Sequence, residues 1–213
     1  MKRPSRKAER VWWEQGHRLV AGIDEVGRGA YAGPVTAAAV ILPERCRLGA
    51  VRDSKMLDGL SRESASMLIK QQAVAIGLGW ASPIEVDQYG LTEAVLRAGQ
   101  RALADLRSPY DAVLLDGNHN YLKEFARSRS IIKADQSSLC VAAASVIAKV
   151  ARDNYMQRLA LMYPEFGFDS HKGYGAPAHW AALNLLGLSP QHRRRWRPLA
   201  GFQDAGLRIQ IVD

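Results

Sequence analysis

The sequence predicts an α/β fold in which a mixed β-sheet is flanked by helices. Short apolar runs of strand length alternate with longer segments whose apolar residues recur at helical spacing. Some of the runs are joined by short turns. The 213 residues can bury one sizeable core with an appendage, and 47% hydrophobic with 23% charged residues are typical of a globular chain rather than a disordered, collagenous or coiled-coil one.

The first predicted strands lie on either side of a glycine-rich segment. The apolar run Leu19–Ile23 ends at Asp24 and Glu25, and a second run covers Val35–Leu42. The segment 27–34 between them has hairpin length. Its glycines expose backbone N–H groups that can approach a nucleic-acid backbone, although a plain glycine-rich hairpin explains the same residues.

The rest of the chain continues the alternation of strands and helices. Further strands are predicted over Val74–Trp80, Ala112–Leu115 and Ile131–Ala134. Helices are predicted over Ser61–Gln72, over Ile84–Leu106 with a break near Gly90, from a cap at Ser137 and Ser138 to a stop at Pro164, and over His179–Leu186. The segment Ser189–Pro198 is predicted to be a basic loop.

Four acids follow the apolar runs that we interpret as strands: Asp24, Glu25, Asp116 and Asp135. If these strands are neighbours, their ends bring four negative charges together, which is unfavourable unless cations neutralise them. Oxygen ligands without His or Cys select hard divalent ions such as Mg²⁺ or Mn²⁺. Two such ions are a common apparatus for phosphodiester cleavage. The alternative is that each acid caps a turn or helix.

Side chains alternate faces along a strand, so two consecutive acids cannot face one site while the strand stays regular. We therefore expect Glu25 to lie past the strand end, where the turn formed by Gly27, Arg28 and Gly29 returns it to the site of Asp24.

Basic and aromatic residues predict a polyanionic partner. The chain carries 29 Lys and Arg against 21 Asp and Glu. Candidate phosphate contacts are Arg28, Lys55 and the run Arg193–Arg195, and Tyr174 lies between glycines where its ring can stack on a sugar or base. Alternatively, the basic residues form solvated surface, and Tyr174 packs inside to pin its loop.

Several classes of protein are excluded by composition. No apolar run approaches the roughly 20 residues that cross a bilayer, and the basic segment Met1–Arg10 leads into no apolar stretch of the kind found in secretory signals. Cys46 and Cys140 show neither metal-binding nor disulfide-framework spacing. We expect a cytoplasmic protein without a membrane partner.

Together these motifs resemble the ribonuclease HII family, in its bacterial form, from about Leu19 to Pro198. The matching segments, in the family's order, are Gly22–Gly29, Ala32–Val35, Asp53–Lys55, Leu115–Gly117, Lys133–Asp135, Ala142–Lys149, Lys172–Gly175 and Ser189–Arg194. The sequence departs from the family pattern at Ala134, Ala176 and Trp196, none of which is a proposed metal ligand.

The resemblance implies a ribonuclease H-like fold with a C-terminal helical extension. We expect a catalytic domain over 17–175, the extension with its basic loop over 176–213, and a basic N-terminal arm over 1–16. The implied catalytic and metal-binding residues are Asp24, Glu25, Asp116 and Asp135, which would bind two Mn²⁺ or Mg²⁺ ions. The implied nucleic-acid-binding residues are Gly27, Arg28, Gly29, Lys55, Tyr174, Arg193 and Arg194.

The implied activity is hydrolysis of RNA in RNA–DNA hybrids and incision at ribonucleotides within duplex DNA, leaving 3′-hydroxyl and 5′-phosphate ends. In this interpretation the backbone at Gly27–Gly29 and Tyr174 sense the ribose 2′-hydroxyl, and the enzyme is a monomer. Another two-metal nuclease on the same fold, such as a resolvase or transposase-like core, is the alternative among enzymes. A catalytically silent hybrid-binding protein would lack at least one of the four acids, and all four are present.

Overall fold

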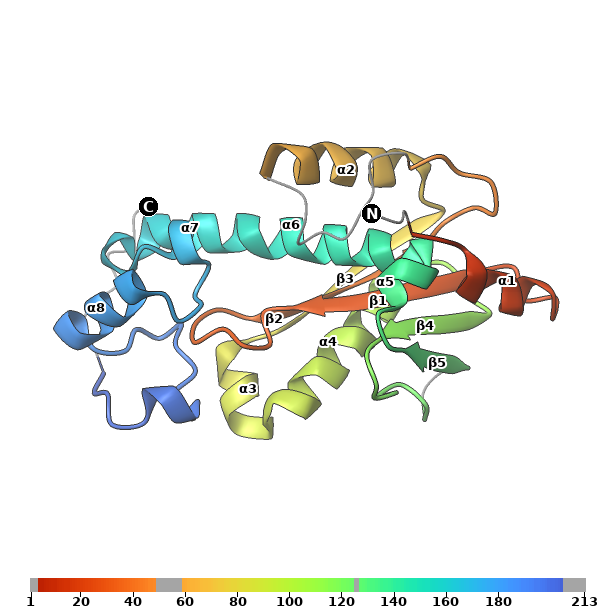
Figure 1. The fold of residues 1–213 in the computed structure, drawn as a ribbon. Coiled ribbons are helices and arrows are strands. Elements are labelled where there is room, and N and C mark those ends of the chain that lie inside the picture. The colour runs from red at the N-terminus through yellow and green to blue at the C-terminus, as the bar shows by residue number, and fades with distance from the viewer. Residues whose placement is uncertain (1–3, 49–58, 125–126, 205–213) are drawn as a thin grey trace.

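The computed structural model describes residues 4–48, 59–124 and 127–204. A five-stranded sheet with the order β3-β2-β1-β4-β5 forms its centre (Figure 1). The strands are β1 (Val20–Val26), β2 (Val35–Ile41), β3 (Ala75–Ala81), β4 (Ala112–Asp116) and β5 (Ser128–Ile131). The first three pair antiparallel, whereas β4 pairs parallel with both β1 and β5. The predicted mixed sheet is confirmed.

Helices cover both faces of this sheet (Figure 1). The helices are α1 (Lys7–Trp13), α2 (Gly59–Gln72), α3 (Pro83–Tyr89), α4 (Leu91–Asp105), α5 (Ala134–Ser137), α6 (Leu139–Met162), α7 (Phe168–His171) and α8 (Pro177–Leu186), with 3₁₀ turns at Pro164–Phe166 and Arg197–Leu199. Helices α3 and α4 lie on one face, and α6 lies on the other with α2 outside it. The predicted break at Gly90 is confirmed, because this residue has φ +81° and separates α3 from α4.

The two cores follow from the alternation of side chains along β2. Ala37, Ala39 and Ile41 belong to the apolar cluster beneath α4, whereas Ala38 and Val40 pack with α6. Glycine permits the closest approach on the α6 face, since a Cβ added at Gly22 of β1 would lie 2.3 Å from the backbone carbon of Cys140. The start of α6 therefore lies directly on the strand that carries Asp24.

Two of the four acids lie in elements other than those expected. Strand β1 continues to Val26, so Glu25 lies within the strand, paired with Ala37 of β2. Strand β5 ends at Ile131, and Asp135 lies in the first turn of the short helix α5. The backbone leaves the strand conformation at Lys133, whose φ of 55° is left-handed. The predictions that Glu25 lies past the end of its strand, and that a strand ends at Asp135, are therefore wrong.

The C-terminal elements pack around the far end of α6 (Figure 1). Met156, Leu159 and Tyr163 of this end share an apolar cluster with Phe168 and Leu183 from the following elements. In the described residues, no helix is long and apolar enough to span a membrane.

Candidate active site

Asp24 and Asp116 occupy equivalent positions on neighbouring parallel strands. Ile23 pairs with Leu115, and each acid is the next residue along its strand. Asp24 accepts a hydrogen bond from the Ser145 side chain of α6 and one of 2.9 Å from the backbone N–H of Glu25. Burial, reinforced by the negative charges of Glu25 and Asp116, raises the pKa of Asp24 to about 8. The strand ends therefore bring at least these acids into electrostatic contact.

Glu25 makes different contacts from its neighbour Asp24. Its Oε1 lies 2.7 Å from Nη1 of Arg28 in an ion pair, and its Oε2 accepts a 3.3 Å hydrogen bond from the Tyr121 hydroxyl. Tyr121 packs against the apolar cluster beneath α4, whereas the Ser145 partner of Asp24 lies on α6. Burial, with the charge of Glu25 next, raises the pKa of Tyr121 well above its usual value, which keeps this hydroxyl a donor.

The fourth acid is linked to the pair through the backbone of α5. The N–H of Ala134 donates to Oδ1 of Asp116 at 2.8 Å, and Asp135 is the next residue. Asp116 thus contributes to placing the first turn of the helix that carries Asp135.

The carboxylate oxygens of these acids suit a hard divalent cation, but their side chains are not arranged as a preformed metal site. Across residues 4–48, 59–124 and 127–204, no group of three or more His, Cys, Asp or Glu side chains is arranged to hold a metal ion. Arg28 engages Glu25, and Ala134 engages Asp116. Burial first, and the charges of Glu25 and Asp116 after it, raise the pKa of Asp24, so its ionised form is disfavoured and a bound cation would favour it. Four-carboxylate metal binding stays a prediction.

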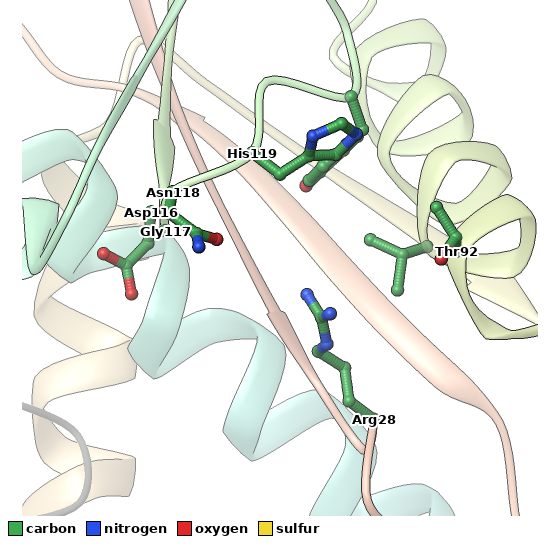
Figure 2. A pocket seen from close by; sticks show the side chains of 8 residues that line it. Arg28, Thr92, Asp116, Gly117, Asn118 and His119 are labelled. Carbon is green, nitrogen blue, oxygen red and sulfur yellow. The ribbon is translucent and has the colours of Figure 1, made fainter.

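An open pocket of about 360 Å³ adjoins the acids (Figure 2). It is lined by Arg28, Thr92, Val95, Asp116, Gly117, Asn118, His119 and Tyr121. Figure 2 shows the Arg28 side chain extending into the space bounded by Asn118, His119 and Thr92. No local pattern in the sequence marks Thr92, Asn118 or Tyr121, whereas Ser145 lies inside one of the family-like segments.

Arg193 supports the glycine-rich loop from inside the protein. Its side chain is 0% exposed and donates to three loop carbonyls: Gly27 at 2.6 Å, Arg28 at 2.9 Å and Gly33 at 3.1 Å. Burial, with the nearby charge of Arg152 second, lowers the pKa of Arg193 to about 9. The prediction that Arg193 contacts the duplex is therefore wrong, because its donors are turned inward.

The other basic candidates differ in their surroundings. Arg194 is exposed and forms a 2.5 Å ion pair with Asp204, so the side chain next to Arg193 does face solvent. Arg28 is also exposed. Lys55 lies outside the described residues.

A second buried guanidinium, which sequence analysis did not identify, connects two candidate binding loops. Arg152 of α6 donates to the carbonyls of Pro34 at 2.9 Å and Lys172 at 2.9 Å, and its guanidinium carbon lies 5.3 Å from the centre of the Tyr174 ring. The Tyr174 carbonyl also bonds Nδ1 of His179 at 2.8 Å. Arg152 therefore sets the placement of Tyr174 relative to the glycine-rich loop.

Fold and site together define a class, that of nucleases with a ribonuclease H-like sheet. Ribonuclease H2 from Pyrococcus horikoshii superposes with a TM-score of 0.71 at 27% identity, covering 84% of this chain and 94% of that one. The predicted fold class is confirmed.

Sequence comparison narrows the class to one family. The family model of ribonuclease HII matches residues 21–198. The ribonuclease HII of Thermosynechococcus vestitus is 48% identical over 187 residues, covering 87% of each chain, and that of Nitrosococcus oceani is 47% identical over 186 residues, covering 87% of this chain and 92% of that one. The chain belongs to the ribonuclease HII family. It is a metal-dependent endoribonuclease of a family that cleaves RNA in RNA–DNA hybrids.

Proposed function

We propose that this enzyme also incises duplex DNA at embedded ribonucleotides, leaving 3′-hydroxyl and 5′-phosphate ends. The observation that carries the proposal is the juxtaposition of Asp24 and Asp116 at the ends of parallel strands, beside a loop that exposes glycine backbone. The carboxylates form the candidate catalytic site, and the exposed glycine backbone of the loop allows the sugar of a substrate to approach closely.

Asp24, Glu25, Asp116 and Asp135 are the proposed ligands of two Mn²⁺ or Mg²⁺ ions. When bound, such a pair of ions activates water and stabilises the leaving oxygen of a phosphodiester. The protein's part is to place the carboxylates: β1 and β4 position three of them, and α5 positions the fourth. If Glu25 is a ligand, Arg28 would share or release its carboxylate, and the guanidinium would then be available for a substrate phosphate.

Recognition of the ribose is assigned to Gly27–Gly29 and Tyr174. The 2′-hydroxyl distinguishes a ribonucleotide from its deoxyribonucleotide neighbours, so the site must offer it partners. Gly29 is exposed, and a Cβ added there would have no atom within 4 Å. Substitution at Gly29 is therefore compatible with the free protein and would be felt only by an approaching substrate.

Contacts with the duplex backbone are assigned to Arg28, Arg194 and Lys55. The exposure of Arg28 and Arg194 supports this role. The exposed Arg195, whose backbone N–H is held by Asp87 at 3.0 Å, extends the same surface.

The test is cleavage of duplexes that carry zero, one or several ribonucleotides, with Mg²⁺ or Mn²⁺. The parent should cut only ribonucleotide-containing duplexes, and Gly29→Ala should lower the rate on a single ribonucleotide without lowering the melting temperature. If Tyr174 acts by stacking, Tyr174→Phe should retain most activity, while Tyr174→Ala should lose about 1 to 3 kcal/mol of transition-state stabilisation.

Equal cleavage of all-DNA duplexes would favour a different two-metal nuclease. If Tyr174→Ala cuts a single-ribonucleotide duplex as fast as the parent and with the same preference, Tyr174 has only a structural role.

A further inference from the structure

The segment before β1 lies outside the family match, which begins at residue 21, yet it packs beside the candidate active site. Its composition predicts a basic arm, but its described part contains a buried acid. Glu9 of α1 is 1% exposed. A buried carboxylate is costly unless it is hydrogen-bonded, so its partners indicate what the segment does.

Glu9 binds the junction between α5 and α6. Its Oε1 accepts hydrogen bonds from the Ser138 hydroxyl at 2.7 Å and from the N–H of Cys140 at 2.9 Å. Ser138 is both the C-cap of α5 and the N-cap of α6. As the N-cap of α6, its hydroxyl also accepts a hydrogen bond from the N–H of Val141. A negative charge at the amino end of the 24-residue helix α6 is favourable because of the helix dipole.

The same segment also holds the backbone of α5. The N–H of Ser5 donates to the carbonyl of Gln136 at 3.0 Å, and its hydroxyl donates to the carbonyl of Ser137 at 3.4 Å. Ala8 of α1 shares an apolar cluster with Ala134 of α5. Helix α5 is thus held by the N-terminal segment at its carboxyl end and by Asp116 at its amino end.

Such support is needed because α5 has four residues, far fewer than an isolated helix requires. A single residue in the left-handed conformation, Lys133, precedes it. The direction in which α5 presents Asp135 therefore depends on the contacts made to α5 from outside.

We propose that Glu9, assisted by Ser5, is a positioning residue that orients α5 so that Asp135 meets the metal-binding carboxylates. This rests on the proposed role of Asp135 as a ligand. Glu9 is buried, and in this proposal it acts through Ser138 and the N–H of Cys140, whereas Ser5 holds the backbone of α5.

The experiment compares the full-length Glu9→Ala, Glu9→Gln and Ser82→Ala variants. Ser82→Ala removes the capping box of α3, on the opposite face of the sheet, and serves as a control of similar stability loss. Two quantities are measured: Mn²⁺ affinity from the electron paramagnetic resonance signal of free Mn²⁺, and hydrogen exchange of the Ser138 N–H, which donates to the Ala134 carbonyl within α5.

Glu9→Ala should speed exchange of the Ser138 N–H by about tenfold and weaken Mn²⁺ binding by about tenfold, the low end of the effect of groups that orient a metal ligand. Glu9→Gln keeps an acceptor oxygen and should restore most of the Ser138 N–H protection and most of the Mn²⁺ affinity. Ser82→Ala should leave both at the parent values. If Glu9→Ala does not fold, Ser5→Ala takes its place, with a smaller change in the same direction.

If Glu9→Ala, or Ser5→Ala in its place, matches Ser82→Ala in both measurements, the positioning role is overturned. An Asp135→Asn variant measured alongside separates the two proposals. Unchanged Mn²⁺ affinity in Asp135→Asn would remove Asp135 from the ligand set, whereas exchange at Ser138 would still decide whether Glu9 holds α5.

Discussion

The acidic end of the site and the glycine-rich loop beside it are stabilised in opposite ways. At the acidic end, Asp24, Glu25 and Asp116 lie close enough that their charges contribute to raising the pKa of Asp24 to about 8. At the loop, the buried guanidinium groups of Arg152 and Arg193 donate to backbone carbonyls. The loop carbonyls have cationic donors within the protein, whereas Asp24 is buried beside two other negative charges, which a cation or a proton would offset.

This difference indicates that the loop and the acids have different roles. A preformed loop can select a sugar by shape and hydrogen bonding without rearranging. If the acids bind cations as proposed, binding would relieve the repulsion between their charges and so favour the bound state. Substitutions of Asp24 or Asp116 should therefore change activity, whereas substitutions of the buried arginines that support the loop should change stability.

The largest effect is expected at the acidic end. Asp24→Asn or Asp116→Asn should lower the cleavage rate by at least about 10²-fold, because a metal pair contributes several kcal/mol to transition-state stabilisation. Asp24→Asn should unfold no more easily than the parent, since a repelled charge is removed. Single-turnover kinetics and urea unfolding measure the two properties, with the exposed Glu165→Gln as control. Near-normal turnover would remove that acid from the mechanism.

The two consecutive arginines at the loop provide the next contrast. Arg193→Ala leaves buried carbonyls without donors and should lower the free energy of unfolding by about 2 kcal/mol. Arg194→Ala removes an exposed ion pair and should cost less than about 1 kcal/mol. Urea unfolding measures both.

Arg194→Ala should instead flatten the salt dependence of duplex affinity, measured with Ca²⁺ in place of the catalytic metal, by about 0.9 in slope for each lost phosphate contact on B-DNA. Equal stability losses in the two variants would contradict the contrast between a buried support and a surface residue.

The smallest effect concerns pH. Burial lowers the pKa of His179 to about 4 and, with the charge of His179 second, that of His192 to about 3. Below a pH of about 6.5 the unfolded chain binds protons that these folded histidines do not, so stability falls as pH falls, by about 1.4 kcal/mol per unit for each group until its folded pKa is reached.

Asp24 acts in the opposite direction because its folded pKa is raised. The comparison is therefore made in an Asp24→Asn background, with and without His179→Asn, by calorimetry at pH 7 and 5. His179→Asn should reduce the loss between the two pH values. An identical loss with and without it would show that His179 does not titrate in this way.

The sequence by itself determined the elements whose signals are local. Strands β1, β2 and β4 follow from continuous apolar runs, the end of α3 from Gly90, and the start of α6 from Ser138. Asp24, Glu25 and Asp116 were found because a carboxylate directly after an apolar run is conspicuous in the sequence, although the structure places all three within the last residues of β1 and β4. Their approach follows from parallel pairing of those strands.

Only the tertiary structure decided which charged residues are buried and what they hold. The bond from Arg193 to Gly33 spans 160 positions, and that from Glu9 to Ser138 spans 129. In the sequence, Arg193 is indistinguishable from the exposed Arg194, and Glu9 is one acid in a basic arm. Burial of a charge depends on partners supplied by distant segments, so no local pattern records it. For the same reason the sequence alone located the acidic end of the site, whereas its supports became visible only in the folded chain.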